Sequence, residues 1–232
     1  MTKIQKISAL VCASFLTAPV AMAAPILIDS FDAFQEVIDV PTGTDVNFST
    51  VTDASILGGS RFMSVTTDPT GNEGSTLRST GTSGFNPEGA LTFANDPGQR
   101  GVATVSYGVA AGGIALGDLT DGNTNDKLFF EVLSADLNGT TLETTVTDGD
   151  SSASITETFD ATFNPFTSFS LFAGIDFGNV QSISFVFDTQ DVRSFDGSVG
   201  SISAVPLPAS ALLLLGGLGG LAAFGKRRRR KA

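Results

Sequence analysis

Short segments in which every second residue is apolar constrain the fold of this chain more than any other feature. In residues 182–187, Ile183, Phe185 and Phe187 alternate with Ser182, Ser184 and Val186. A period of two places alternate side chains on opposite faces of a β-strand. Residues 102–107 alternate in the same way, and further segments rich in Thr, Val and Phe favour strands; these span 127–133, 140–147, 152–159 and 167–172.

Turn-forming residues separate these segments. Asn138-Gly139 lies between two strand segments and predicts a hairpin, and Asp148-Gly149-Asp150 marks another turn. About ten short strands within one domain are typical of two packed antiparallel sheets. We therefore predict an all-β domain over residues 24–204, folded as a jelly-roll-like antiparallel β-sandwich.

One segment near the start of this domain has a different period. Phe31, Phe34, Val37 and Ile38 recur at the three- and four-residue spacing of an amphipathic helix, and Ser30 can cap its first turn. The pattern predicts a short N-terminal helix over residues 30–38.

Residues 1–23 have the organisation of a secretory signal peptide. Two lysines precede an apolar stretch, and the small residues Ala21 and Ala23 frame a cleavage site. We expect signal peptidase to cut after Ala23, or alternatively after Ala24. Cys12 lies within this segment, so the mature chain would contain no cysteine, no disulfide and no thiol chemistry.

Residues 205–232 contain three signals in a fixed order. Pro206 and Pro208 favour an extended backbone, an uncharged apolar run follows over 209–225, and six basic residues close the segment over 226–231. As a helix the run would be about 25 Å long, at the short end of what crosses a bilayer. The basic cluster favours the cytoplasmic side. Physically the segment predicts a transmembrane helix, which serves either as a plain anchor or as a processing signal.

The residues of this tail resemble a known sorting signal. Val205, Pro206, Leu207, Pro208 and Ala209, followed by the Gly-containing apolar run and the arginine cluster, are similar to the VPLPA-CTERM signal of the PEP-CTERM class in Gram-negative bacteria. The resemblance implies export across the inner membrane, processing by an exosortase, and association with exopolysaccharide at the cell surface or in the extracellular matrix. The motif residues would be a substrate of that enzyme.

The charge of the chain is distributed unevenly. The full chain has a net charge of −11, but residues 24–204 contain five basic and all 24 acidic residues, a net charge of −19. Nucleic acid is therefore excluded as a partner, because phosphate binding needs a basic surface. For the four arginines, Arg61, Arg78, Arg100 and Arg193, we expect internal ion pairs, with acidic sugars as the alternative partner.

The residues that usually perform catalysis are scarce. The chain has no histidine, no tryptophan and a single tyrosine, Tyr107. Without histidine or a mature cysteine, a catalytic triad and a His-based zinc site are excluded. A pair of carboxylates could still hydrolyse a glycosidic bond, although the sequence singles out no pair. We predict that the protein is not an enzyme.

Two segments of the domain resemble a known fold family. The segment 57–65, Leu-Gly-Gly-Ser-Arg-Phe-Met-Ser-Val, and the closing strand at 197–204 are similar to segments of galactose-binding-like jelly rolls in exported bacterial proteins. The resemblance implies a jelly roll and contact with glycans. It transfers no ligand residues.

One loop is rich in oxygen ligands. Ca²⁺ is bound by carboxylate and amide oxygens, which a glycine-containing loop can bring together. The candidate ligands are Asp118, Asp121, Asn123, Asn125 and Asp126. Their spacing does not match an EF-hand, and the simpler interpretation is an Asp/Asn/Gly turn without a metal. No other cofactor is expected.

Together these features predict an exported surface or matrix protein with a structural or adhesive role in an exopolysaccharide or biofilm layer. The first alternative is a module that binds a specific glycan or Ca²⁺. The second alternative is a glycan hydrolase that uses two carboxylates.

Overall fold

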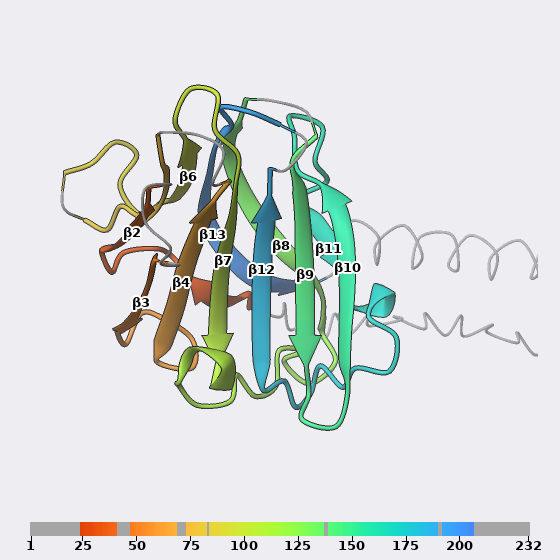
Figure 1. The fold of residues 1–232 in the computed structure, drawn as a ribbon. Coiled ribbons are helices and arrows are strands. Elements are labelled where there is room, and N and C mark those ends of the chain that lie inside the picture. The colour runs from red at the N-terminus through yellow and green to blue at the C-terminus, as the bar shows by residue number, and fades with distance from the viewer. Residues whose placement is uncertain are drawn as a thin grey trace, which may run out of the picture.

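The computed structural model describes residues 24–40, 47–68, 73–82, 84–136, 139–189 and 192–206. Two antiparallel sheets pack face to face and enclose one hydrophobic core (Figure 1). The seven-stranded sheet contains β1 (Ile26–Asp29), β2 (Gln35–Asp39), β5 (Ser75–Ser79), β6 (Leu91–Asn95), β8 (Asn125–Ala135), β11 (Phe166–Ser168) and β13 (Asp196–Pro206). The six-stranded sheet contains β3 (Asn47–Thr52), β4 (Ser60–Thr67), β7 (Gly101–Gly108), β9 (Thr141–Thr147), β10 (Ser152–Thr158) and β12 (Ser182–Asp188).

The order of the strands is that of a jelly roll. From β6 onward, the neighbours in one sheet are β6-β13-β8-β11 and those in the other are β7-β12-β9-β10. In the first of these sheets β6 lies beside β13, and in the second β7 lies beside β12. This is the arrangement of two nested Greek keys. The prediction of an antiparallel sandwich is confirmed.

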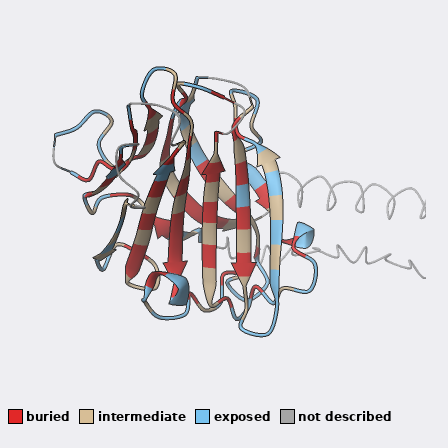
Figure 2. Ribbon diagram, in the orientation of Figure 1, coloured by how far each residue is buried: buried red, intermediate tan, exposed pale blue. Residues whose placement is uncertain are grey.

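The core forms because inward-facing side chains alternate along each strand (Figure 2). Phe185 and Phe187 of β12 point inward and contact other core rings: Phe130 of β8, in the opposite sheet, lies 5.2 Å from Phe185, centroid to centroid, and Phe159, just after β10, lies 5.2 Å from Phe187. Both pairs meet edge to face, the geometry that aromatic quadrupoles favour. Most of the phenylalanines in strand patterns thus hold the two sheets together.

The predicted N-terminal helix over 30–38 is wrong. Residues 35–39 form strand β2, which pairs with β5 in unbroken register from Gln35 opposite Ser79 to Asp39 opposite Ser75. The helical periodicity arose by coincidence: Phe31 and Val37 are buried, but Phe34 and Ile38 are each 46% exposed. The residues that decide the structure here are polar, because buried Gln35 and Asp39 make hydrogen bonds to side chains and backbone of the opposite sheet.

The expected hairpin at Asn138-Gly139 is also not formed as predicted. The strands before and after it, β8 and β9, belong to different sheets, so this connection crosses from one sheet to the other. The turn at Asp148-Gly149-Asp150 does join two paired strands, β9 and β10. The segment predicted as a strand over 167–172 contains only the end of β11, followed by a 3-10 turn over Phe169–Leu171.

Candidate functional site

A hollow lies along the outer half of β8. Strand β11 pairs with β8 only over Lys127–Phe129, and β8 continues for six further residues with no neighbouring strand on that side among the described residues. A groove of about 600 Å³ follows this open edge. Cavities of this size hold small ligands or a few units of a polymer.

Aromatic rings form the apolar part of the groove. Phe129 packs against Phe166 with the ring centroids 5.1 Å apart, and Phe163 contacts Phe159 at 5.1 Å and Phe130 at 5.9 Å. The carbonyl of Pro165 accepts a hydrogen bond from the Phe130 N–H at 2.9 Å and fixes the loop against β8. The rings are therefore held in place by the core rather than by a ligand.

Oxygen-bearing side chains line the rest of the groove. Glu131 Oε2 accepts a hydrogen bond from the Ser201 hydroxyl at 2.9 Å, which orients its carboxylate. The absence of a side chain at Gly200 makes room for this arrangement, since a Cβ there would lie 3.0 Å from Glu131 Oε2 and 3.3 Å from Leu133 Cδ2. Ser134, also in the lining, shares a 2.7 Å hydrogen bond with Ser198 of β13.

The charged groups of the groove are all acidic. Glu131, Asp136 and Asp160 line it, and its described lining contains no lysine or arginine. Hydrogen bonds from the hydroxyl and backbone N–H of Thr162 lower the pKa of Asp160, so this carboxylate is ionised at neutral pH. Near the groove, burial raises the pKa of Asp196, and the carboxylates of Asp136 and Asp96 raise it further. The groove therefore accepts hydrogen bonds and disfavours anionic ligands.

The predicted Ca²⁺ loop forms a hydrogen-bonded turn. Asp118 Oδ1 accepts hydrogen bonds from the Thr120 N–H at 2.7 Å and the Thr120 hydroxyl at 2.6 Å, and these bonds lower the pKa of Asp118. Asp121 and Asn123 have left-handed backbone angles with φ of 46° and 71°. Within the described ranges, no group of three or more Asp and Glu side chains is close enough to hold a metal ion.

The other two candidate ligands begin β8. Asn125 is buried and its Nδ2 donates a hydrogen bond to the Leu119 carbonyl at 3.3 Å. Asn125 Oδ1 and Asp126 Oδ1 are buried and have no hydrogen-bond partner among the residues that the structure describes. The structure thus brings Asn125 against the loop that contains Asp118, and leaves two oxygen atoms without a donor.

The expected targeting residues fall mostly outside the described residues. This applies to Ala21, Ala23, Leu207, Pro208 and Ala209, whereas Ala24 is the first described residue. Val205 and Pro206, the first two residues of the sorting motif, are the last two of β13, opposite Lys127 and Asn125 of β8. Among the residues described, no helix is long and apolar enough to span a membrane.

Ion pairs were expected for the arginines, and the structure shows three. Arg61 pairs with Asp29 at 2.7 Å between the sheets, where both side chains are fully buried. Arg78 pairs with Glu36 on the outer face of the seven-stranded sheet, and Arg100 lies 3.9 Å from Asp68. Arg193 donates instead to the carbonyl of Gly98.

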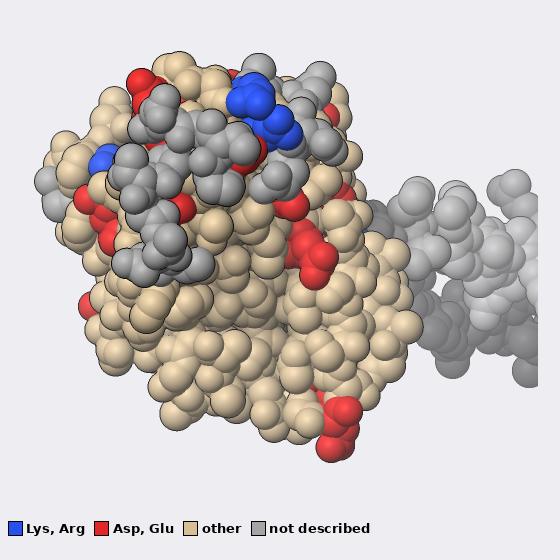
Figure 3. Space-filling model, viewed as in Figure 1, with Lys and Arg blue, Asp and Glu red and all other residues tan. Residues whose placement is uncertain are grey.

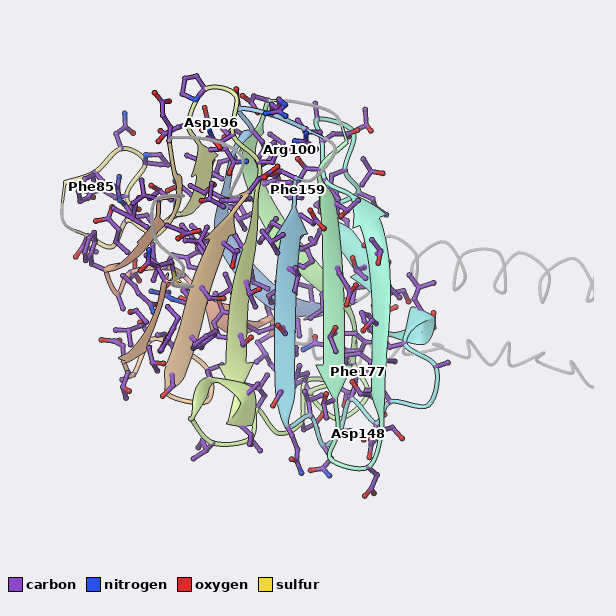
Figure 4. All side chains as sticks on the ribbon, in the orientation of Figure 1. Phe85, Arg100, Asp148, Phe159, Phe177 and Asp196 are labelled. Carbon is purple, nitrogen blue, oxygen red and sulfur yellow. The ribbon has the colours of Figure 1, made fainter. Side chains whose placement is uncertain are left out.

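The groove was not predicted from the sequence. Its β8 residues lay within the expected strand 127–133, but nothing in that pattern shows that β11 is only three residues long. The other acidic turns also gave no site: Asp148 lies in the β9–β10 turn, at the opposite end of the sandwich from Asp196 (Figure 4). Gly200, inside the expected strand 197–204, is a sequence signal that another side chain lies close to the backbone at this position.

Comparison with known proteins identifies no family. No family model matches the sequence, and no curated protein matches it. Among solved structures, a family 11 carbohydrate-binding module of a cellulosomal cellulase of Clostridium thermocellum is similar with 14% identity and a TM-score of 0.36, covering 79% of this chain and 95% of the module. A family 11 module of the same organism, in complex with a β-1,3-1,4-mixed-linked tetrasaccharide, has 17% identity and a TM-score of 0.34, covering 74% of this chain and 95% of that chain. Likeness at this level assigns no ligand to the present chain.

Proposed function

We propose that this chain is an exported surface or matrix protein whose sandwich domain binds a polysaccharide in the groove along β8. The observation that carries the proposal is the composition of the groove: ordered aromatic rings beside oriented carboxylate and hydroxyl oxygens. Sugars present both an apolar ring face and many hydroxyl donors, so a site for them needs both kinds of group. The bound protein would then be an adhesive component of an exopolysaccharide layer.

The charge of the groove defines the class of sugar. Its charged side chains, Glu131, Asp136 and Asp160, accept hydrogen bonds from hydroxyl or amine groups. A uronic acid placed there would bring a second negative charge into a site that lacks a cation, which is unfavourable. The groove therefore suits a neutral or amine-bearing polysaccharide.

The two ends of the chain suit delivery to such a layer. We propose cleavage of the signal peptide by signal peptidase after Ala23, transient anchoring in the inner membrane, and processing at the Val205–Ala209 motif by an exosortase. Intact-mass analysis of protein released from the cell surface tests this. Loss of residues 226–232 is expected. A mature product that retains this basic end would identify the tail as a permanent anchor.

Binding in the groove can be tested on the full-length chain in detergent, using affinity electrophoresis through gels that contain soluble neutral polysaccharides. Glu131→Gln is expected to weaken binding about tenfold or more, because a hydrogen bond to a charged group contributes about 1.5–3 kcal/mol. Glu73→Gln removes the same charge at an exposed position away from the groove and is the matched control.

The outcomes separate the three functional hypotheses. Equal binding by Glu131→Gln and wild type would refute the groove as the site. A complete lack of saturable binding to neutral and amine-bearing glycans would leave a purely structural role. Release of reducing ends that disappears in Glu131→Gln would instead identify a carboxylate-dependent hydrolase.

We also propose that Ca²⁺ binds at the loop of Asp118, Asp121, Asn123, Asn125 and Asp126. The unpartnered buried Oδ1 of Asn125 supports this, because Asn125 lies against the loop of Asp118 and a cation would satisfy that oxygen. The measurement is the thermal midpoint with added Ca²⁺ and with a chelator. A Ca²⁺-dependent increase that Asp118→Asn abolishes is expected, and identical midpoints would leave a metal-free turn.

A further inference from the structure

The outer face of the six-stranded sheet is covered with hydroxyl groups in register. Each strand contributes one residue to a row that crosses the whole sheet, because its neighbours pair residue by residue. The central row consists of Thr50, Phe62, Ser106, Ser184, Thr145 and Ser154. The next row consists of Phe48, Ser64, Thr104, Val186, Glu143 and Thr156. We call these two rows the hydroxyl face.

Four of the eight hydroxyl groups in the two rows are joined to one another in pairs. Ser106 and Ser184 share a hydrogen bond of 2.9 Å, and Thr145 and Ser154 share one of 2.7 Å. Each hydroxyl has one donor and two acceptor sites, so a group that makes one such bond retains capacity toward the outside. The face therefore presents an ordered array whose spacing across the strands is about 4.8 Å.

The hydroxyl face is almost free of charge although the domain is strongly acidic. In its two rows Glu143 is the single charged residue. The view of this side of the molecule shows a broad uncharged surface over the lower parts of β4, β7 and β12, with one acidic group beside it over β9 and others near the edges (Figure 3). A domain with 24 acidic and five basic residues thus keeps both signs of charge away from the centre of one sheet.

An aromatic pair lies at one end of the face. Phe48 on the edge strand β3 is 69% exposed, and its ring stacks on Phe62 of β4 with centroids 6.1 Å apart and planes inclined by 28°. The two stacked rings form a small apolar patch beside the hydroxyl rows, and an aromatic ring can pack against the apolar face of a sugar. Rings and neutral hydroxyls together are the groups that complement a sugar surface.

The dimensions of the face argue against a second copy of the chain as its partner. The whole outer side of the six-stranded sheet, which contains the hydroxyl face, is about 24 Å wide, from five spacings of about 4.8 Å, and about 20–27 Å long, from strands of six to eight residues. The resulting area, roughly 500–650 Å², is below the roughly 800 Å² per partner of a stable protein interface. Two copies would also bring two strongly negative domains together. The surface of a packed polysaccharide repeats the same groups, so several of its chains can contact the sheet at the same time. Linked contacts of this kind bind more tightly than one small contact alone.

We propose that the hydroxyl face binds the surface of an ordered, neutral polysaccharide, in which packed chains present a regular layer of hydroxyl groups. This site is separate from the groove and does not depend on it. The groove opens along β8 of one sheet, and the hydroxyl face covers the outside of the other sheet. A protein with both sites connects a single chain in the groove to a packed polysaccharide layer on the opposite side.

The test measures depletion of the full-length protein from solution by insoluble cellulose, chitin and β-1,3-glucan particles, each in crystalline and in swollen amorphous form. Wild type is expected to bind at least one crystalline form. Thr145→Glu and Phe48→Ala are each expected to lower the partition coefficient about tenfold, because a buried unpaired charge and a lost ring contact both oppose binding. Thr76→Glu places the same charge on the outer face of the seven-stranded sheet and should leave binding unchanged.

Several results would overturn the proposal. One is the absence of binding to every crystalline form, and another is equal binding by Thr145→Glu and wild type. Dimerisation in sedimentation equilibrium that Thr145→Glu abolishes would assign the face to a second copy instead. If soluble oligosaccharides block particle binding by wild type but not by Glu131→Gln, the groove is responsible for that binding. Equal particle binding by wild type and Glu131→Gln supports the hydroxyl face. Thermal midpoints of all variants report whether each remains folded.

Discussion

The buried arginine between the sheets allows a quantitative prediction. Arg61 donates through Nη1 to Asp29 Oδ2 at 2.7 Å, through Nε to Gln35 Oε1 at 2.9 Å and through Nη2 to the Ala33 carbonyl at 2.6 Å. Both members of the Arg61–Asp29 pair are fully buried. Replacement of Arg61 by Met fills a similar volume but leaves the carboxylate without its cation and Gln35 Oε1 without its donor.

The expected loss of stability is about 3–5 kcal/mol, the usual cost of breaking a buried pair by removing one partner. Two hydrogen bonds to Asp29 remain, from the Phe31 N–H at 2.7 Å and the Tyr107 hydroxyl at 3.0 Å, which favours the lower half of that range. For a domain of this size the thermal midpoint should fall by about 6–20 °C. Urea unfolding followed by far-UV circular dichroism measures the change.

Arg78→Met provides the matched control. Arg78 pairs with Glu36 on a partly exposed surface, so its loss should cost no more than about 1 kcal/mol. The double variant Arg61→Met with Asp29→Asn should recover part of the loss, since it removes the uncompensated carboxylate. If Arg61→Met costs less than Arg78→Met, the reasoning that the buried pair organises the centre of the sandwich is refuted.

Three further predictions concern pH and backbone geometry. Burial raises the pKa of Tyr107 well above 10, and the nearby Asp29 carboxylate raises it further. Above about pH 10 the tyrosine therefore ionises in the unfolded chain but not in the folded one, so the free energy of unfolding should fall as the pH rises. Tyr107→Phe should flatten this decline in urea titrations between pH 9 and 11. The pKa of Asp196 is raised by burial and by two nearby aspartates, so its charge destabilises the fold at neutral pH. Asp196→Asn should therefore raise the thermal midpoint at pH 7. The gain should vanish as the pH is lowered through the pKa of this group. Gly58 has φ of +78° and a Cβ there would lie 2.8 Å from the Ile114 carbonyl, so Gly58→Ala should destabilise by more than about 1 kcal/mol, and an unchanged urea midpoint would contradict this.

The strands were predictable because their alternation reflects burial of one face only. Residues 102–107 and 182–187 lie in β7 and β12, and the strand expected over 140–147 is β9, which begins at residue 141. The alternation survives in sequence because each of these strands has a neighbour on both sides and one face in the core.

The exceptions depend on contacts that are distant in sequence. Strand β2 escaped prediction because its inward residues Gln35 and Asp39 are polar and are buried through partners 26 and 28 residues away. The crossing at Gly139 resembles a hairpin locally, and only the jelly-roll order shows that its two strands separate. The groove along β8 follows from the shortness of β11, which no local pattern indicates.

The position of β13 determines how the domain would respond to mechanical load. This strand lies in the middle of its sheet, paired with β8, β6 and β1, and it ends at Pro206, where the tail begins. The groove lies along the end of β8 that is opposite the start of β13, whereas Pro206 is opposite Asn125 at the other end of β8. Tension between a polymer in the groove and a tethered C-terminus would therefore act along the β8–β13 pair and shear its hydrogen bonds together. A pair loaded in shear resists much greater force than one that is peeled open from its end.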